Sequence, residues 1–145
     1  ALTEEHDIVY RDNPQVGAVP PVPAMAAVDE DFKREIVPDP VLLFRYSALT
    51  FNGHRIHYDR RYATGVEGYP GLIVHGPLIA TLLVDLVRRE LPDASIRAFA
   101  FKAASPLFDT HPFMLCGKRG ADGHIELWAR NHQGHLAMRA RAEFA

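Results

Sequence analysis

Apolar residues recur at helical spacing between Pro77 and Leu91, which is the most regular pattern of hydrophobic and polar positions in the chain. The pattern predicts an α-helix, because no charge interrupts it before Asp85 and Pro92 prevents its continuation. Gly76 at the N-cap and proline at the first helical position would begin this helix. A helix so apolar over its first half should be enclosed on most sides, as by a curved sheet wrapped around it. Its apolar positions are Leu78, Ile79, Leu82, Leu83, Leu86 and Val87.

Four strand-like runs follow this helix and are separated by turn signals. The tightest connections are residues 119–123 and 131–134, which combine Gly with Asp or Asn as hairpin turns do. The strands that they join should therefore be antiparallel neighbours, and the chain as a whole should have an α+β fold. The four runs cover residues 96–105, 113–118, 124–131 and 135–144.

The residues before the helix show weaker patterns. Residues 14–40 hold six of the eleven prolines, which disfavours regular structure there apart from a possible helical turn at residues 29–35. Residues 41–50 predict a strand, because they form an apolar run that ends near a polar cluster. Residues 59–64 predict one or two helical turns capped by their first residue, an aspartate.

Length and composition fit one domain. The chain has 145 residues, of which 48% are hydrophobic, enough for a single core but not for a second full domain. We expect an N-terminal arm and linker over residues 1–40 and a folded domain over residues 41–145, which could be the C-terminal half of a longer protein. Cys116 is the one cysteine, so no internal disulfide is expected, and its strand-like surroundings predict a packed core thiol.

Charge and hydropathy exclude several classes of partner. The formal net charge of −2 gives no basic excess of the kind that nucleic acid or an anionic membrane would select. The longest apolar run, residues 72–84, is shorter than the roughly 20 residues of a membrane span. The N-terminus is acidic and lacks the basic and apolar regions of a secretory signal, so we expect a cytoplasmic location.

Polar residues of catalytic types gather between Asn52 and Asp59. These eight residues contain an amide, two imidazoles, a guanidinium and a carboxylate, and such a density is typical of a functional site. A second stretch, residues 71–78, runs from apolar residues into the Gly76-Pro77 helix start. The free backbone N–H groups at that helix start could face an anion or a polarised carbonyl.

The motif from Thr50 to His57, in this order of helix and strands, resembles the MaoC-like enoyl-CoA hydratases. Their pattern is Ser-Gly-Asp-x-Asn-Pro-Ile-His, and the chain has Thr-Phe-Asn-Gly-His-Arg-Ile-His at this place. The longer stretch 49–59, together with residues 4–11, resembles the branch of mesaconyl-CoA hydratase and type 2 hydroxyacyl-thioester dehydratase. This resemblance implies a hot-dog fold over residues 41–145, with a long central helix wrapped by a curved antiparallel sheet.

The resemblance also implies a reaction: reversible addition of water to an enoyl thioester. Coenzyme A or an acyl carrier would be part of the substrate, so no cofactor is expected. A lone hot dog exposes a sheet edge, and by the resemblance it forms its substrate tunnel only against a second hot dog. We therefore expect a homodimer or pairing with a separate first half.

Carried over by position, the family's catalytic acid falls on Asn52, its histidine on His57 and its oxyanion-hole glycine on Gly76. Asn52 departs from the family pattern, because an amide can orient a water or substrate but cannot transfer a proton. His57 is thus the remaining proton-transfer group, with an ordinary pKa of about 6.5 that suits neutral pH. The backbone N–H of Gly76 would stabilise the developing enolate.

Five further residues are candidates for substrate contact, and each has an alternative role. Arg55 could instead tie the loop together through Asp59, and His54 could be structural. Lys102 could meet the phosphates of coenzyme A or be a solvated charge. The three histidines of the two stretches could suggest a metal, but no Asp, Glu or Cys completes a ligand set, so no metal is expected. The candidates are His54, Arg55, His75, Pro77 and Lys102.

Two other functions remain open. A hot-dog thioesterase would employ a carboxylate on or near the central helix, where the chain offers Asp85 and Glu90, both far from Gly76 along the helix. A non-catalytic hot dog that only binds acyl chains would be expected to have lost Asn52 or His57. The sequence favours the hydratase over both.

Overall fold

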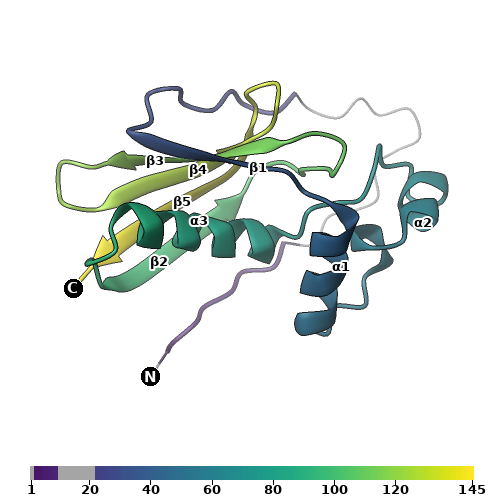
Figure 1. The fold of residues 1–145 in the computed structure, drawn as a ribbon, viewed down its shortest axis with the longest axis horizontal. Coiled ribbons are helices and arrows are strands. Elements are labelled where there is room, and N and C mark those ends of the chain that lie inside the picture. Colours follow the sequence, from purple (N-terminus) through teal and green to yellow (C-terminus); the bar gives the residue numbers. More distant parts are fainter. Residues whose placement is uncertain (1, 10–21) are drawn as a thin grey trace.

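A five-stranded antiparallel sheet packs one of its faces against a long helix, α3 (Gly76–Glu90) (Figure 1). This computed structural model describes residues 2–9 and 22–145. The strand order is β1-β3-β4-β5-β2, and the arrangement is the predicted α+β hot-dog fold. The strands are β1 (Phe32–Ile36), β2 (Ile96–Ala103), β3 (Phe113–Arg119), β4 (Ile125–Arg130) and β5 (Leu136–Phe144).

The apolar face of α3 forms the core with the inner face of the sheet. Leu83 and Leu86 on the helix are fully buried, as are Leu115, Leu127 and Met138 on β3, β4 and β5. The predicted helix is confirmed to within one residue at each end.

The start of α3 differs from the expectation in one detail. The N-cap is His75, with an extended backbone, and Gly76 and Pro77 are the first two helical residues. Glycine is therefore not required as the cap.

The two hairpins have the predicted antiparallel pairing. Trp128 lies opposite Cys116 of β3 and Arg139 of β5, which fixes the register of the three central strands. Gly123 and Gly134 in the connecting turns have φ values of +76° and +86°, which glycine adopts without steric cost.

The prediction of a strand over residues 41–50 is wrong, because this segment is the helix α1 (Pro40–Leu49). Asp39 caps the helix: its carboxylate accepts hydrogen bonds from the backbone N–H groups of Val41 and Leu42 at 2.8 and 3.0 Å. Only Leu43 and Ser47 are buried, four residues apart on one face. A short apolar run does not distinguish helix from strand, whereas the Asp-Pro start does.

The proline-rich segment contains β1 in place of a helical turn. Phe32 lies opposite Gly117 and Ile36 opposite Phe113, so β1 is an edge strand of the sheet. Residues 24–26 also join the sheet, where the amide of Ala26 donates to the carbonyl of Gly134 at 2.9 Å. The folded unit therefore begins before residue 41.

Two short helices lie beyond the N-terminal end of α3, on the same side as α1 (Figure 1). The 3-10 helix η1 (Arg55–His57) carries the histidine motif, and α2 (Arg60–Gly65) follows it. Asp59 caps α2 as predicted, by accepting a 3.0 Å hydrogen bond from the amide of Tyr62. In the described part of the chain, no helix has both the length and the apolar character needed to cross a membrane.

Candidate active site

Backbone hydrogen bonds bring the two polar stretches of the sequence side by side. The amide of Asn52 donates to the carbonyl of Ser47 at 2.9 Å, which folds the chain back at the end of α1. The amide of Ile73 donates to the carbonyl of Ile56 at 3.0 Å, which joins η1 to the segment that leads into α3. As a result, His57 lies next to the start of α3.

His57 is held in one tautomer by a backbone carbonyl. Its Nδ1 lies 2.8 Å from the carbonyl oxygen of Ile73, and because a carbonyl only accepts, Nδ1 must carry the hydrogen. In the neutral ring Nε2 therefore has the free lone pair. Burial lowers the pKa of His57 below its usual value, the Ile73 carbonyl opposes that shift, and nearby His54 adds to it.

His75 stacks on His57. The two ring centroids are 3.8 Å apart and the planes differ by 16°. His75 is 1% exposed, and its Nε2 lies 2.8 Å from the hydroxyl oxygen of Ser47 on α1. Burial, with a smaller contribution from His57, lowers the pKa of His75 to about 4. Both rings are therefore neutral at neutral pH.

Asn52 sits at the edge of a mostly apolar hollow of about 380 Å³. Its side-chain oxygen accepts a 3.0 Å hydrogen bond from the amide of His54, which fixes the orientation of the amide group. This leaves its NH₂ group as the available donor. Phe44, Ser47, Ala48, Phe51, Asn52, Gly53 and Tyr58 line the hollow.

Gly76 offers an open approach to a helix N-terminus. A Cβ atom built on Gly76 would meet no heavy atom within 4 Å, so the space in front of its Cα is not filled by this chain. The amides of the first helical turn have no acceptor within the helix, and the helix dipole favours negative charge there. An oxyanion is the kind of group that suits this position.

A model of the family described as hydroxyacyl-thioester dehydratase type 2 matches residues 1–109. The chain belongs to this family. It is 48% identical over 145 residues to mesaconyl-C(4)-CoA hydratase of Chloroflexus aurantiacus, across 98% of the chain and 50% of that relative. It is 42% identical over 81 residues to the mitochondrial type 2 hydroxyacyl-thioester dehydratase of Schizosaccharomyces pombe, across 54% of the chain and 27% of that protein. The chain thus spans about half the length, or less, of these relatives.

Solved structures agree with the fold. A MaoC-like dehydratase from Phytophthora capsici superposes with a TM-score of 0.70 at 17% identity, over 89% of this chain and 45% of that one. A chain of the ChsH1-ChsH2 complex from Mycobacterium tuberculosis superposes with a TM-score of 0.64 at 19% identity, over 78% of this chain and 91% of that one. At these identities the likeness establishes the hot-dog fold.

Three of the other predicted site residues differ in their surroundings. His54 is exposed, and its ring meets His57 edge-on with centroids 5.7 Å apart, so it borders the site. Arg55 binds Asp59 through two hydrogen bonds of 3.1 and 2.7 Å and stacks over Tyr62. These contacts fit the alternative role of Arg55, in which it ties the loop together through Asp59. Pro77 is exposed next to the open approach at the helix start.

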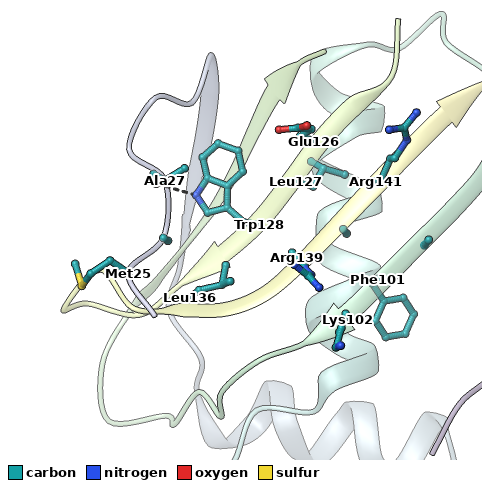
Figure 2. A pocket seen from close by; sticks show the side chains of 13 residues that line it. Met25, Ala27, Phe101, Lys102, Glu126, Leu127, Trp128, Leu136, Arg139 and Arg141 are labelled. Atoms are coloured by element: carbon teal, nitrogen blue, oxygen red, sulfur yellow. Dashed lines mark hydrogen bonds between the residues drawn. The ribbon is translucent and has the colours of Figure 1, made fainter. Parts of the chain in front are cut away.

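Lys102 lies apart from the histidines. It is on β2, directly opposite Arg139, on the face of the sheet that points away from α3 (Figure 2). There it lines a separate groove of about 530 Å³ whose wall includes Trp128, with the indole N–H donating to the carbonyl of Ala27. The structure therefore does not bring Lys102 together with the other site residues.

Some site features escaped the sequence. Ser47 was hidden in the mistaken strand, although its spacing from Leu43 is helical. The Ile73 carbonyl is a backbone group without a side-chain signature. Cys116, which is outside the site, is buried as predicted for a core thiol, and burial raises the pKa of its thiol to about 11. Among residues 2–9 and 22–145, no three His, Cys, Asp or Glu side chains are grouped as a metal site.

Proposed function

We propose that this chain is the catalytic hot dog of a hydratase/dehydratase that adds water reversibly across the double bond of an enoyl thioester. The observation that carries the proposal is the tautomer of His57, whose Nδ1–H is held by the Ile73 carbonyl beside the open N-terminus of α3. Membership of the type 2 dehydratase family supports the reaction class.

The proposed hydration uses one base. Nε2 of His57 takes a proton from a water as the water oxygen bonds to the β-carbon, and the electron pair of the double bond moves towards the thioester oxygen. The Gly76 N–H stabilises that enolate, and the NH₂ group of Asn52 orients the water. The enolate then collapses as the α-carbon takes the same proton from the imidazolium, so no cofactor is needed.

The neutral state of His57 suits both directions. In dehydration, neutral His57 would first remove the α-proton and then return it to the leaving hydroxyl. Both directions therefore begin with the same protonation state, which the lowered pKa of His57 maintains at neutral pH.

We place the acyl group in the hollow next to Asn52. Its lining includes Phe44, Phe51 and Tyr58, which suit an apolar chain. A crotonyl thioester, whose acyl chain is apolar, is therefore the first substrate to test. A short branched dicarboxylic enoyl-CoA is the comparison, because the Chloroflexus relative is named for mesaconyl-CoA. Coenzyme A and an acyl carrier are both candidate thioester carriers.

Pairing with a second hot dog is part of the proposal. Among the strands that the structure describes, β2 pairs only with β5, so its other side presents unpaired backbone groups. The ChsH1-ChsH2 chain with the same fold comes from a complex of two named components. Either a second copy of this chain or a separate hot dog would cover the β2 edge. A monodisperse monomer with full activity in sedimentation would contradict this.

A thioesterase is disfavoured by the surroundings of Asp85, the carboxylate midway along α3. Asp85 forms ion pairs with Arg34 at 2.8 Å and with Arg89 at 2.7 Å. Its carboxylate is therefore already paired with two guanidinium groups, which does not suit attack on a thioester.

The experiment compares His57→Gln with His54→Gln on enoyl-CoA substrates, following loss of the double bond and release of free thiol separately. Losing a general base costs about 10²- to 10⁴-fold in turnover, so His57→Gln should lower kcat by that factor with little change in KM. His54→Gln should retain most of the activity. Thiol release without hydration would indicate a thioesterase, and a fully active His57 variant would overturn the mechanism.

A further inference from the structure

A buried carboxylate outside both motifs is tied to the site. Asp109 lies in the loop before β3, and its side chain is fully buried. The carboxylate binds both terminal nitrogens of Arg60 and accepts a 2.8 Å hydrogen bond from the amide of Leu72. The amide of Asp109 in turn donates to the carbonyl of Leu72 at 2.9 Å. Asp109 and Leu72 are therefore joined twice.

These bonds lead directly to His57. Leu72 precedes Ile73, whose carbonyl accepts the Nδ1–H of His57. Arg60 is the first residue of α2 and follows the histidine motif by three residues. The Asp109 carboxylate thus connects the segment that carries His57 with the segment that carries its hydrogen-bond acceptor.

Gly71 shows how closely the carboxylate approaches the backbone. A Cβ atom on Gly71 would lie 2.6 Å from Oδ1 of Asp109 and 2.8 Å from a side-chain carbon of Thr110. Real Cβ atoms essentially never make contacts that short, so a larger residue at this position would displace the side chains of Asp109 and Thr110. The glycine-rich loop before the Gly76 helix is thereby shaped to admit this carboxylate.

We propose that Asp109, paired with Arg60, is a positioning group that holds the Ile73 carbonyl against Nδ1 of His57 and so keeps Nε2 free for proton transfer. Charge-assisted hydrogen bonds to a buried carboxylate are the strong kind, and here the carboxylate holds the N–H of Leu72. The backbone amide of Asp109 holds the Leu72 carbonyl, which is in the peptide next to the Ile73 carbonyl. The Ile73–Val74 peptide keeps its own hydrogen bond, from the Val74 amide to the carbonyl of Leu107 at 2.9 Å. Without the Asp109 bonds, the preceding residues would shift, the Ile73 carbonyl would fit Nδ1 less well, and the Nε2–H tautomer of His57 would become populated. The consequence for turnover rests on the proposed function, whereas the tautomer itself does not.

The test is histidine ¹⁵N NMR on the wild type and on three variants, together with kcat and KM. Asp109→Asn would turn N–H donors towards the guanidinium, and Arg60→Gln would remove the cation. Both should give a mixture of His57 tautomers and a fall in kcat of about 10- to 100-fold, with KM within about threefold, because misplacement by about 1 Å affects the reacting geometry. Arg60→Lys keeps the charge but loses the two-pronged contact, so it should be intermediate.

The matched control is Glu30→Gln, which removes the charge from another ion pair with a buried carboxylate, Glu30 with Arg130 at 2.8 Å. This control should lower the melting temperature while leaving the His57 tautomer and kcat as in the wild type.

Each outcome decides the proposal. If Asp109→Asn and Arg60→Gln lower only the melting temperature, as the control does, Asp109 has a purely structural role and the proposal is wrong. If Asp109→Asn does not fold, the two Arg60 variants decide whether the proposal holds. The fold should tolerate them, since half of the Arg60 side chain is exposed. If the wild type shows no hydratase activity, the proposed function fails, and the tautomers still decide the role of Asp109.

Discussion

The imidazole rings of His57 and His75 lie nearly parallel with their centroids 3.8 Å apart. Two imidazolium ions stacked at this distance would repel each other strongly in a buried site. Burial already lowers the pKa of both rings, and His57 lowers the pKa of His75 further. The pair therefore carries at most one positive charge, which is what a site with a single general base requires.

The activity should depend on pH through His57. Because burial lowers the pKa of this ring, kcat/KM should rise with pH and reach half of its plateau below pH 6.5, the ordinary imidazole value. His54 contributes to the lowering, so His54→Gln should move the midpoint towards higher pH. Rate profiles between pH 4 and 8 measure both. A midpoint above 6.5 in the wild type would contradict the assignment.

Stability should also fall in acid, through His75. Its pKa is about 4 in the folded protein and that of an ordinary imidazole in the unfolded chain, so the unfolded chain binds the proton at higher pH. The free energy of unfolding should therefore decrease as the pH drops from about 6.5 to 4, by about 3 kcal/mol from this group. Denaturant unfolding at several pH values measures this slope.

His75→Phe is the control for that measurement. The phenyl ring keeps an aromatic surface against His57 but cannot titrate. The variant loses the hydrogen bond with Ser47, worth about 1 kcal/mol, at every pH. Its stability should then change less between pH 6.5 and 4 than that of the wild type; an unchanged slope would show that other groups cause the acid effect.

Asn52 should act by orientation. Asn52→Ala removes both the acceptor that holds the His54 amide and the NH₂ donor, so kcat should fall about 10- to 100-fold. Asn52→Asp keeps the acceptor and should retain part of the activity. Steady-state kinetics on the three proteins checks the order, and an alanine variant with the parent rate would exclude the role of Asn52.

The sequence predicted the elements whose signals are local. The helix over residues 77–91 has an unbroken apolar face, and the hairpin turns have glycines that the observed positive φ values require. The error at residues 41–50 arose because a ten-residue helix with two buried positions resembles an apolar strand. β1 was missed because pairing with β3, a contact distant in sequence, makes it a strand.

The sequence proposes a set of site residues but not their geometry. The motif proposed Asn52, His57 and Gly76; the structure places His57 beside the start of α3, and Asn52 at the end of α1 next to Ser47. The Ile73 carbonyl and the Asp109 carboxylate depend on how three loops meet, and neither has a sequence pattern of its own. Lys102 was proposed from its charge alone, and strand alternation puts it on the far face of the sheet.

Gly76→Ala separates a functional glycine from a structural one. The structure has room for the methyl group, and the position has no positive φ, so the fold should tolerate the change. Alanine has a helix propensity up to about 1 kcal/mol better than glycine, so the melting temperature should stay the same or rise. If the thioester oxygen approaches the Gly76 amide, however, the methyl group would stand in its path, and kcat/KM should fall by about 10-fold or more.

Ser95→Ala, a change of similar size in the loop between α3 and β2, is the control for Gly76→Ala and should leave the kinetics unchanged. Calorimetry and enoyl-CoA hydration assays on the same samples give both quantities. A Gly76→Ala variant that hydrates at the parent rate would show that the oxyanion is stabilised elsewhere.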